Sequence, residues 1–140
     1  MSYEERLKNV KGFEDAFKLV KTAVSEKYRM RRAGLNLLLQ DMPNFIGAYH
    51  VLGSNYIVVN RYMLNAIRML TKSCEEYNAY LFVVLAHEYL HSLGIVDEFK
   101  VRELTYNMCD TLLGATHVAT KMARDDPSSL YPDLKKLMIT

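Results

Sequence analysis

The sequence contains no tryptophan, and its 140 residues include only two cysteines, three prolines and six glycines. Cys74 and Cys109 are too few and too far apart for a disulfide framework or a zinc finger, so we expect two reduced thiols in a cytoplasmic protein. The longest apolar run, of about eight residues, is too short to span a membrane. No basic stretch followed by an apolar region marks a signal peptide, so we expect neither a leader nor a membrane anchor.

Charge of one sign is also scarce, because 18 Lys and Arg residues balance 16 Asp and Glu residues to a net charge of +2. This bias is too small to indicate binding to nucleic acid or to a membrane by itself. Half of the residues are hydrophobic and 24% are charged, which are ordinary values for a globular protein. We therefore expect a single domain over residues 1–140, long enough to fold unaided.

The composition is ordinary, but the stretch over residues 86–98 has a pattern that is typical of a metal site. His87 and His91 are four residues apart, so on a helix they lie on one face, one turn from each other, where both imidazoles can reach a single ion. Glu88 lies about 100° further round the helix. It therefore has less access to the ion itself but can reach a water molecule on it, which is the position of a general base.

The residues around this motif predict that it is helical. Ser73 followed by Glu76 forms a capping box, and the apolar residues 79–86 then continue into the motif without glycine or proline. Gly94 stands where a helix ends in a left-handed residue. The sequence thus predicts a buried helix of about twenty residues with the motif in its last two turns.

Histidine and carboxylate ligands indicate zinc. Neutral imidazole suits this ion, and two His residues with one further ligand leave a position open for water, which the metal acidifies. Glu88 can then take a proton from that water and return it to a leaving amine. The pattern predicts a hydrolytic zinc site with His87 and His91 as ligands.

The stretch resembles the zincin superfamily of metallopeptidases, whose active-site helix carries H-E-x-x-H. Gly94 lies three residues after His91 and Asp97 lies six after it. This spacing is similar to the metzincin pattern H-E-x-x-H-x-x-G-x-x-H, with Asp97 in place of the last histidine. The resemblance implies a zinc-dependent peptidase acting on a peptide or protein, with Asp97 as the third ligand. It also implies a small antiparallel sheet ahead of the helix, whose edge strand pairs with an extended substrate.

The residues themselves leave the third ligand open. Asp97 is also a good N-cap for a following helix, which is a structural reason for an aspartate there. Glu98 is adjacent, Glu103 lies further along that helix on its polar face, and His117 follows later. Each of these three side chains is an alternative ligand to Asp97.

Two other functions remain open. Bacterial RNA-maturation endoribonucleases share the spacing in the pattern H-G-x-x-H-x-x-G-x-D-H, with glycine at the position of Glu88, so the glutamate favours peptide hydrolysis. A nuclease would need basic residues for RNA, for which the candidates are Arg29, Arg31 and Arg32. The second alternative is a metal-binding module without catalytic activity.

The rest of the chain predicts an α+β fold. A capping box at Ser2 and Glu5 and apolar spacing as far as Val24 predict one amphipathic helix. Residues 35–40 predict a strand, and residues 45–51 and 56–59 a β-hairpin. Asn60 is the expected cap of a helix over residues 61–71. An apolar stripe then predicts a long helix from Asp97 to about Arg124, covering the motif helix or the sheet.

Further candidates in the sequence have weaker support. A tyrosine near the site often steadies the oxyanion in zincins, and Tyr80, Tyr106 and Tyr131 are the candidates. His50 lies alone in the hairpin, where a histidine is more often a packing or surface residue than a ligand.

Overall fold

A computed structural model of the chain describes residues 1–42, 46–125, 127–134 and 136. The elements follow one another in an α+β arrangement. Their order is α1 (Tyr3–Lys8), α2 (Phe13–Tyr28), β1 (Asn36–Gln40), β2 (Ala48–His50), β3 (Tyr56–Asn60), α3 (Arg61–Leu70), α4 (Cys74–Ser92), α5 (Glu98–Leu113), α6 (Val118–Arg124) and α7 (Pro127–Leu130).

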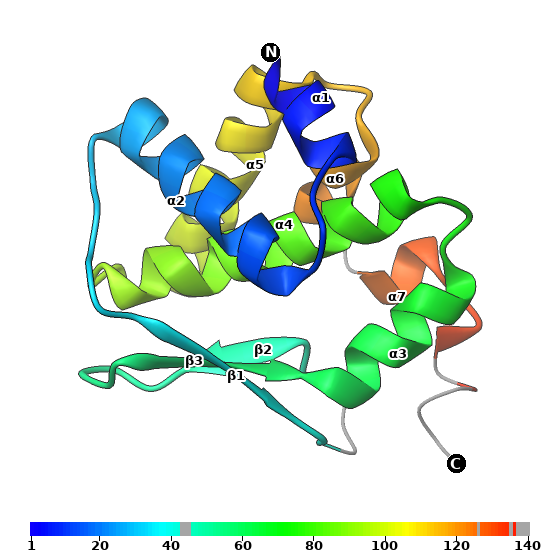
Figure 1. The fold of residues 1–140 in the computed structure, drawn as a ribbon, viewed down its shortest axis with the longest axis horizontal. Coiled ribbons are helices and arrows are strands. Elements are labelled where there is room, and N and C mark those ends of the chain that lie inside the picture. The colour runs from blue at the N-terminus through cyan, green and yellow to red at the C-terminus, as the bar shows by residue number, and fades with distance from the viewer. Residues whose placement is uncertain (43–45, 126, 135, 137–140) are drawn as a thin grey trace.

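Helix α4 runs through the middle of the molecule, with α1, α2 and α5 on one side and the sheet on the other (Figure 1). It begins as predicted, because the Ser73 hydroxyl accepts a hydrogen bond from the backbone N–H of Glu76. Its buried residues lie on all sides rather than along one stripe, as expected for a helix covered on both faces. The predicted motif helix is thus confirmed as the central element of the core.

The sheet has three strands in the order β1-β3-β2. Strands β2 and β3 form the predicted antiparallel hairpin, with Ala48 opposite Val59 and His50 opposite Ile57. The predicted first strand of the hairpin began at Phe45, which lies outside the described residues. The expectation of a wholly antiparallel sheet is wrong, because β1 pairs with β3 in parallel. Strand β2 is consequently an edge strand, and it packs against α4.

The predicted single N-terminal helix is two helices, α1 and α2. The cap at Ser2 is confirmed, but the chain leaves the helix at Asn9 and re-enters it after Gly12, whose φ of +91° favours glycine. The Asn78 side chain donates to the carbonyls of Leu7 and Val10, which holds the connecting segment against α4. The apolar spacing continues across this break, so periodicity alone did not reveal it.

The predicted helix from Asp97 to Arg124 is also divided. Its first part, α5, ends before Gly114, which has a φ of +100°, and the second part, α6, begins after His117. The Thr120 hydroxyl donates to the carbonyl of Gly114 across the turn. The two helices pack on each other and on α4, so one apolar stripe serves two helices that cover the same core.

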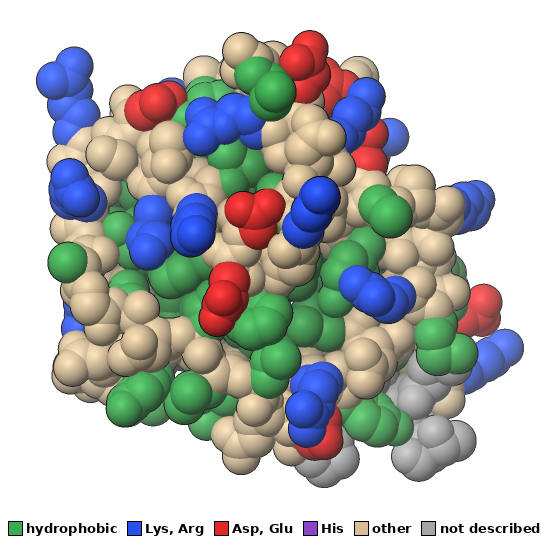
Figure 2. Space-filling model, in the orientation of Figure 1, with side chains coloured by type: hydrophobic (Ala, Val, Ile, Leu, Met, Phe, Trp, Pro, Cys, Tyr) green, Lys and Arg blue, Asp and Glu red, His purple; other side chains and the backbone are tan. Residues whose placement is uncertain are grey.

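The basic segment before β1 is used partly for structure. Arg32 donates from Nη1 to the carbonyl of Ser92 and from Nη2 to the carbonyl of Ser54 and to Oδ1 of Asn55, at 2.8–3.0 Å. It therefore ties the hairpin turn to the end of α4. On the face drawn in Figure 2, Lys and Arg side chains are scattered among Asp and Glu, and hydrophobic side chains gather toward the sheet.

Replacing Arg32 with alanine is expected to lower the free energy of unfolding by about 2–4 kcal/mol, because three hydrogen bonds from a charged group are lost. Urea unfolding measures the change. Arg31→Ala is the matched control, since Arg31 is exposed, and its effect should stay within about 0.5 kcal/mol. Equal effects of the two substitutions would contradict the structural role of Arg32.

Candidate metal centre

The last two turns of α4 bring His87 and His91 together. Their ring centroids are 4.9 Å apart, and each side chain is about one-fifth exposed. After His91 the helix ends, and Gly94, with a φ of +99°, turns the chain back toward the histidines. The sequence predicted the pairing of the two histidines, from their spacing, and the turn at Gly94.

Glu98, the first residue of α5, reaches both imidazoles. Its Oε1 lies 3.0 Å from His87 Nε2 and 2.9 Å from His91 Nε2. One ligand atom from each of the three side chains lies within 4.8 Å of the other two. Since zinc binds imidazole nitrogen and carboxylate oxygen at about 2.0–2.2 Å, three such atoms can surround one ion after a small adjustment.

Asp97 is not brought to the histidines. Its Oδ1 accepts hydrogen bonds from the backbone N–H groups of Phe99 and Lys100, at 2.9 and 3.3 Å, so it caps α5. The structure thus brings Glu98, rather than its neighbour Asp97, to the two histidines after the glycine turn. Glu103 also lies apart from the site, on the surface, where it pairs with Lys100.

The hydrogen bonds of His91 determine what its ring offers the site. Nδ1–H donates to the carbonyl of Ile95 at 2.8 Å, which leaves a lone pair on Nε2 of the neutral ring. That lone pair faces Glu98 Oε1, another acceptor, at 2.9 Å. Two acceptors at this distance require a positive charge between them, which either a proton or a metal ion can supply. The hydrogen bond from Nδ1–H to the Ile95 carbonyl is of the kind that orients the rings of metal-binding histidines in general.

Burial and charge shift the acid–base properties of the site. Burial lowers the pKa of the His87 imidazole, which favours the neutral form that binds metals. Burial of Glu98 acts to raise its pKa, but the hydrogen bond from His91 and the neighbouring histidine charge outweigh it and lower the pKa. Burial thus favours a neutral His87 ring, while a positive charge at the imidazoles, from a proton or from a metal ion, favours an ionised Glu98 carboxylate.

Glu88 projects beside the three candidate ligands. Burial raises the pKa of its carboxyl group to about 7, and a backbone hydrogen bond from His50 on strand β2 limits the rise. A carboxyl group with this pKa can both accept and return a proton near neutral pH. The residue predicted as general base therefore has a suitable environment for that role.

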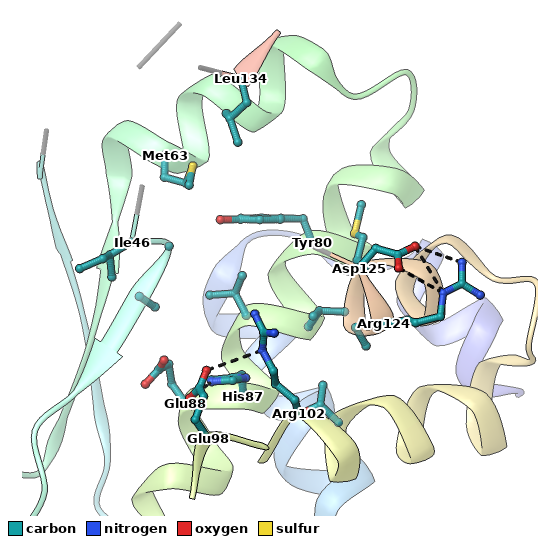
Figure 3. A pocket seen from close by; sticks show the side chains of 17 residues that line it. Ile46, Met63, Tyr80, His87, Glu88, Glu98, Arg102, Arg124, Asp125 and Leu134 are labelled. Atoms are coloured by element: carbon teal, nitrogen blue, oxygen red, sulfur yellow. Dashed lines mark hydrogen bonds and ion pairs between the residues drawn. The ribbon is translucent and has the colours of Figure 1, made fainter. Parts of the chain in front are cut away.

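A cleft of about 620 Å³ opens beside these residues. His87, Glu88 and Glu98 lie at one end of it, below Tyr80 and Met63 (Figure 3). Tyr80 is the one candidate oxyanion tyrosine that lines the cleft, since Tyr131 donates to Glu76 and neither Tyr131 nor Tyr106 is among the lining residues. Arg102 also lines it, although no motif in the sequence pointed to this residue. Its position four residues after Glu98 on one helix is a signal available in the sequence.

A second group of potential ligands lies away from the cleft. Glu4, Glu75 and His117 also bring ligand atoms within 4.8 Å of one another. However, His117 Nδ1 accepts a hydrogen bond from the backbone N–H of Ala119, so Nε2 carries the proton of the neutral ring. Nε2 lies 3.3 Å from Glu75 Oε1, without the geometry of a hydrogen bond. Because Nε2 of this ring has no lone pair, we interpret His117 as the cap of α6 rather than as a metal ligand. It is not among the residues that converge with His87, His91 and Glu98.

The burial of Glu88 gives a pH-dependent prediction for the metal-free protein. Its carboxyl pKa is 4.5 without burial and about 7 in the folded state, so between these values the folded protein holds a proton that the unfolded chain has released. Because the folded state tolerates the protonated carboxyl group of Glu88 better than the carboxylate, stability is lost as the pH rises from 4.5 through about 7. We expect Glu88→Gln to raise the free energy of unfolding by on the order of 2 kcal/mol at about pH 8 and by much less at about pH 5.

Urea unfolding with a chelator present, at both pH values, measures this difference. Glu103→Gln is the control, because Glu103 is exposed and its substitution should give the same small effect at both pH values. A gain from Glu88→Gln that is equal at the two pH values would contradict the burial of an ionisable Glu88.

Comparisons with known proteins give no relative from which to transfer a role: no family model, no curated protein and no solved structure matches the chain. Within the described residues, no helix is both long and apolar enough to cross a membrane.

Proposed function

We propose that the protein is a zinc-dependent peptidase in which His87, His91 and Glu98 bind the metal and Glu88 is the general base. The observation that carries the proposal is the convergence of two imidazole Nε2 atoms on one carboxylate oxygen, next to a buried glutamate in a cleft. Glu98 takes the place that the metzincin-like spacing gives to Asp97.

The donor set fits zinc. Two imidazole nitrogens and one carboxylate oxygen are ligands that this ion accepts, and three protein ligands are typical of catalytic rather than structural sites. The two facing acceptors on His91 and Glu98 are satisfied when a cation lies between them. A bound zinc ion supplies a Lewis acid that polarises the scissile carbonyl and makes water easier to deprotonate.

Glu88 carries out the proton transfers. It takes a proton from the attacking water as the water oxygen bonds to the carbonyl carbon, and the electron pair of the C=O double bond moves to the oxygen. When the C–N bond breaks, its electron pair stays on nitrogen, the oxyanion pair forms the C=O bond again, and Glu88 donates its proton to the nitrogen. The products are a carboxylic acid and an amine, and the remaining water proton then passes from the acid to the amine to leave a carboxylate and an ammonium group. A pKa of about 7 suits both transfers near neutral pH.

Strand β2 supports a peptide substrate. Backbone groups alternate in direction along a strand, and Gly47 faces β3, since its carbonyl accepts from the N–H of Asn60, so the backbone groups of His50 face away from β3. The backbone groups of Ala48, two residues earlier, therefore face the same side, where Ala48 lines the cleft. An extended peptide can pair with such an edge as an additional strand. RNA binding through the basic segment has less support, because Arg32 is engaged in holding the hairpin.

The test is hydrolysis of a mixture of internally quenched peptides by metal-free and zinc-loaded protein, with single-stranded RNA offered in parallel. We expect cleavage of peptides by the zinc-loaded protein alone, its loss on chelation and its return with zinc. RNA cleavage would support the nuclease alternative. Zinc binding without cleavage of either substrate would indicate the non-catalytic module, and both results would contradict the proposal.

A further inference from the structure

Two arginines line the cleft, and they differ in what holds them. Arg124 donates from Nε and Nη2 to Asp125, so its guanidinium is already occupied by a carboxylate. Arg102 makes one ion pair, in which its Nε lies 3.7 Å from Glu98 Oε2. Within the described part of the chain, its two terminal nitrogens make no hydrogen bond, and Glu98 is its one ion-pair partner. Arg102 thus has donors available to a molecule in the cleft.

Arg102 lies close to the three candidate metal ligands. It follows Glu98 by one turn of α5, so both side chains leave the same face of that helix. One oxygen of Glu98 contacts both histidines, and the other faces Arg102. Figure 3 shows the guanidinium beside Glu98 and His87, at the end of the cleft that holds Glu88. Burial lowers the pKa of His87, and the charge of Arg102 acts on it in the same direction.

Hydrolysis of a peptide places negative charge on the carbonyl oxygen during attack by water. Donors aimed at that oxygen contribute more to the rate than those that bind the ground state, because the charge develops only in the transition state. A guanidinium offers several N–H donors in a rigid plane and keeps its charge at any working pH. The ion pair with Glu98 holds this group at the reacting end of the cleft.

We propose that Arg102 is a catalytic residue whose terminal nitrogens donate hydrogen bonds to the substrate carbonyl oxygen as it becomes an oxyanion. The inference rests on the proposed peptidase function and adds the oxyanion donor, for which the sequence offered only tyrosines. Arg102 is half exposed, with 57% of its side chain accessible, so its removal should leave the fold intact.

The first test is kinetic. Zinc-loaded Arg102→Ala should lose about 10²–10³-fold in kcat with little change in KM, as for removal of an oxyanion donor. Added guanidinium should restore part of the rate, and Arg102→Lys should retain part of it. Lys100→Gln is the control, because it removes a positive charge from the same helix outside the cleft, where Lys100 pairs with Glu103, and it should leave kcat unchanged.

The second test does not need activity. Inorganic phosphate is a tetrahedral oxyanion, and its affinity for the zinc-loaded protein can be measured by calorimetry. We expect Arg102→Ala to weaken phosphate binding by about 10-fold or more, with Lys100→Gln as the control. The zinc content and the melting temperature of each variant are measured first, and both should equal those of the wild type.

The outcomes separate the two proposals. Unchanged kcat and unchanged phosphate affinity in Arg102→Ala would overturn the role of Arg102. A rise in KM confined to acidic peptides, with kcat preserved, would also overturn it, because Arg102 would then bind a substrate carboxylate. If wild-type protein cleaved no peptide but Arg102→Ala still lost phosphate affinity, the peptidase function and the catalytic role would both fall, and Arg102 would remain only as an anion-binding residue of the cleft.

Discussion

Replacing Glu88 with glutamine should lower kcat for peptide hydrolysis by about 10²–10⁴-fold while the protein keeps its zinc. Glutamine has almost the same shape, and its carbonyl oxygen can still accept the backbone hydrogen bond from His50. It cannot take a proton from water or return one to nitrogen. Only the chemical step should therefore become slower. Steady-state kinetics measure kcat, and elemental mass spectrometry measures the zinc content of the same variant.

The control for this prediction is Glu103→Gln, an exposed substitution on α5 that should leave kcat and zinc content unchanged. A Glu88→Gln variant that retained full activity with bound zinc would remove Glu88 from the mechanism. A variant that lost its zinc would instead assign Glu88 to metal binding.

The second large effect concerns Glu98. Glu98→Ala should weaken zinc binding by about 100-fold or more, because one of three protein ligands is lost and the two imidazoles keep the ion alone. Asp97→Asn is the matched control at the adjacent position. Asparagine caps a helix about as well as aspartate, so this variant should keep both its stability and its zinc affinity.

A competition assay with a chromophoric chelator gives both affinities. Asp97→Ala adds a structural comparison, since loss of the cap should lower the free energy of unfolding by about 1 kcal/mol without affecting zinc. Loss of zinc in Asp97→Asn together with full affinity in Glu98→Ala would restore the ligand assignment based on the metzincin-like spacing.

The motif helix was predictable because its signals are local. The cap at Ser73, the four-residue spacing of His87 and His91 and the turn at Gly94 each act within one or two helical turns. The choice between Asp97 and Glu98 was not. An acidic side chain suits both a helix cap and a metal, and one residue changes the direction of a side chain by about 100° at the start of a helix.

Other features depended on contacts between distant segments. The parallel pairing of β1 with β3 joins segments that are not adjacent strands in the chain, and strand patterns do not specify it. The break between α1 and α2 is held by Asn78 of α4, which lies 71 and 68 residues after its partners Leu7 and Val10 in the chain. Arg102 enters the cleft only because α5 packs back on α4.

Zinc titration by calorimetry into chelator-treated protein tests the central claim most directly. The arrangement of His87, His91 and Glu98 predicts a single zinc per wild-type chain with submicromolar affinity, and no such binding in His91→Ala. Binding that is absent from the wild type, or that is equally tight in His91→Ala, would contradict the metal centre and the hydrolytic function built on it.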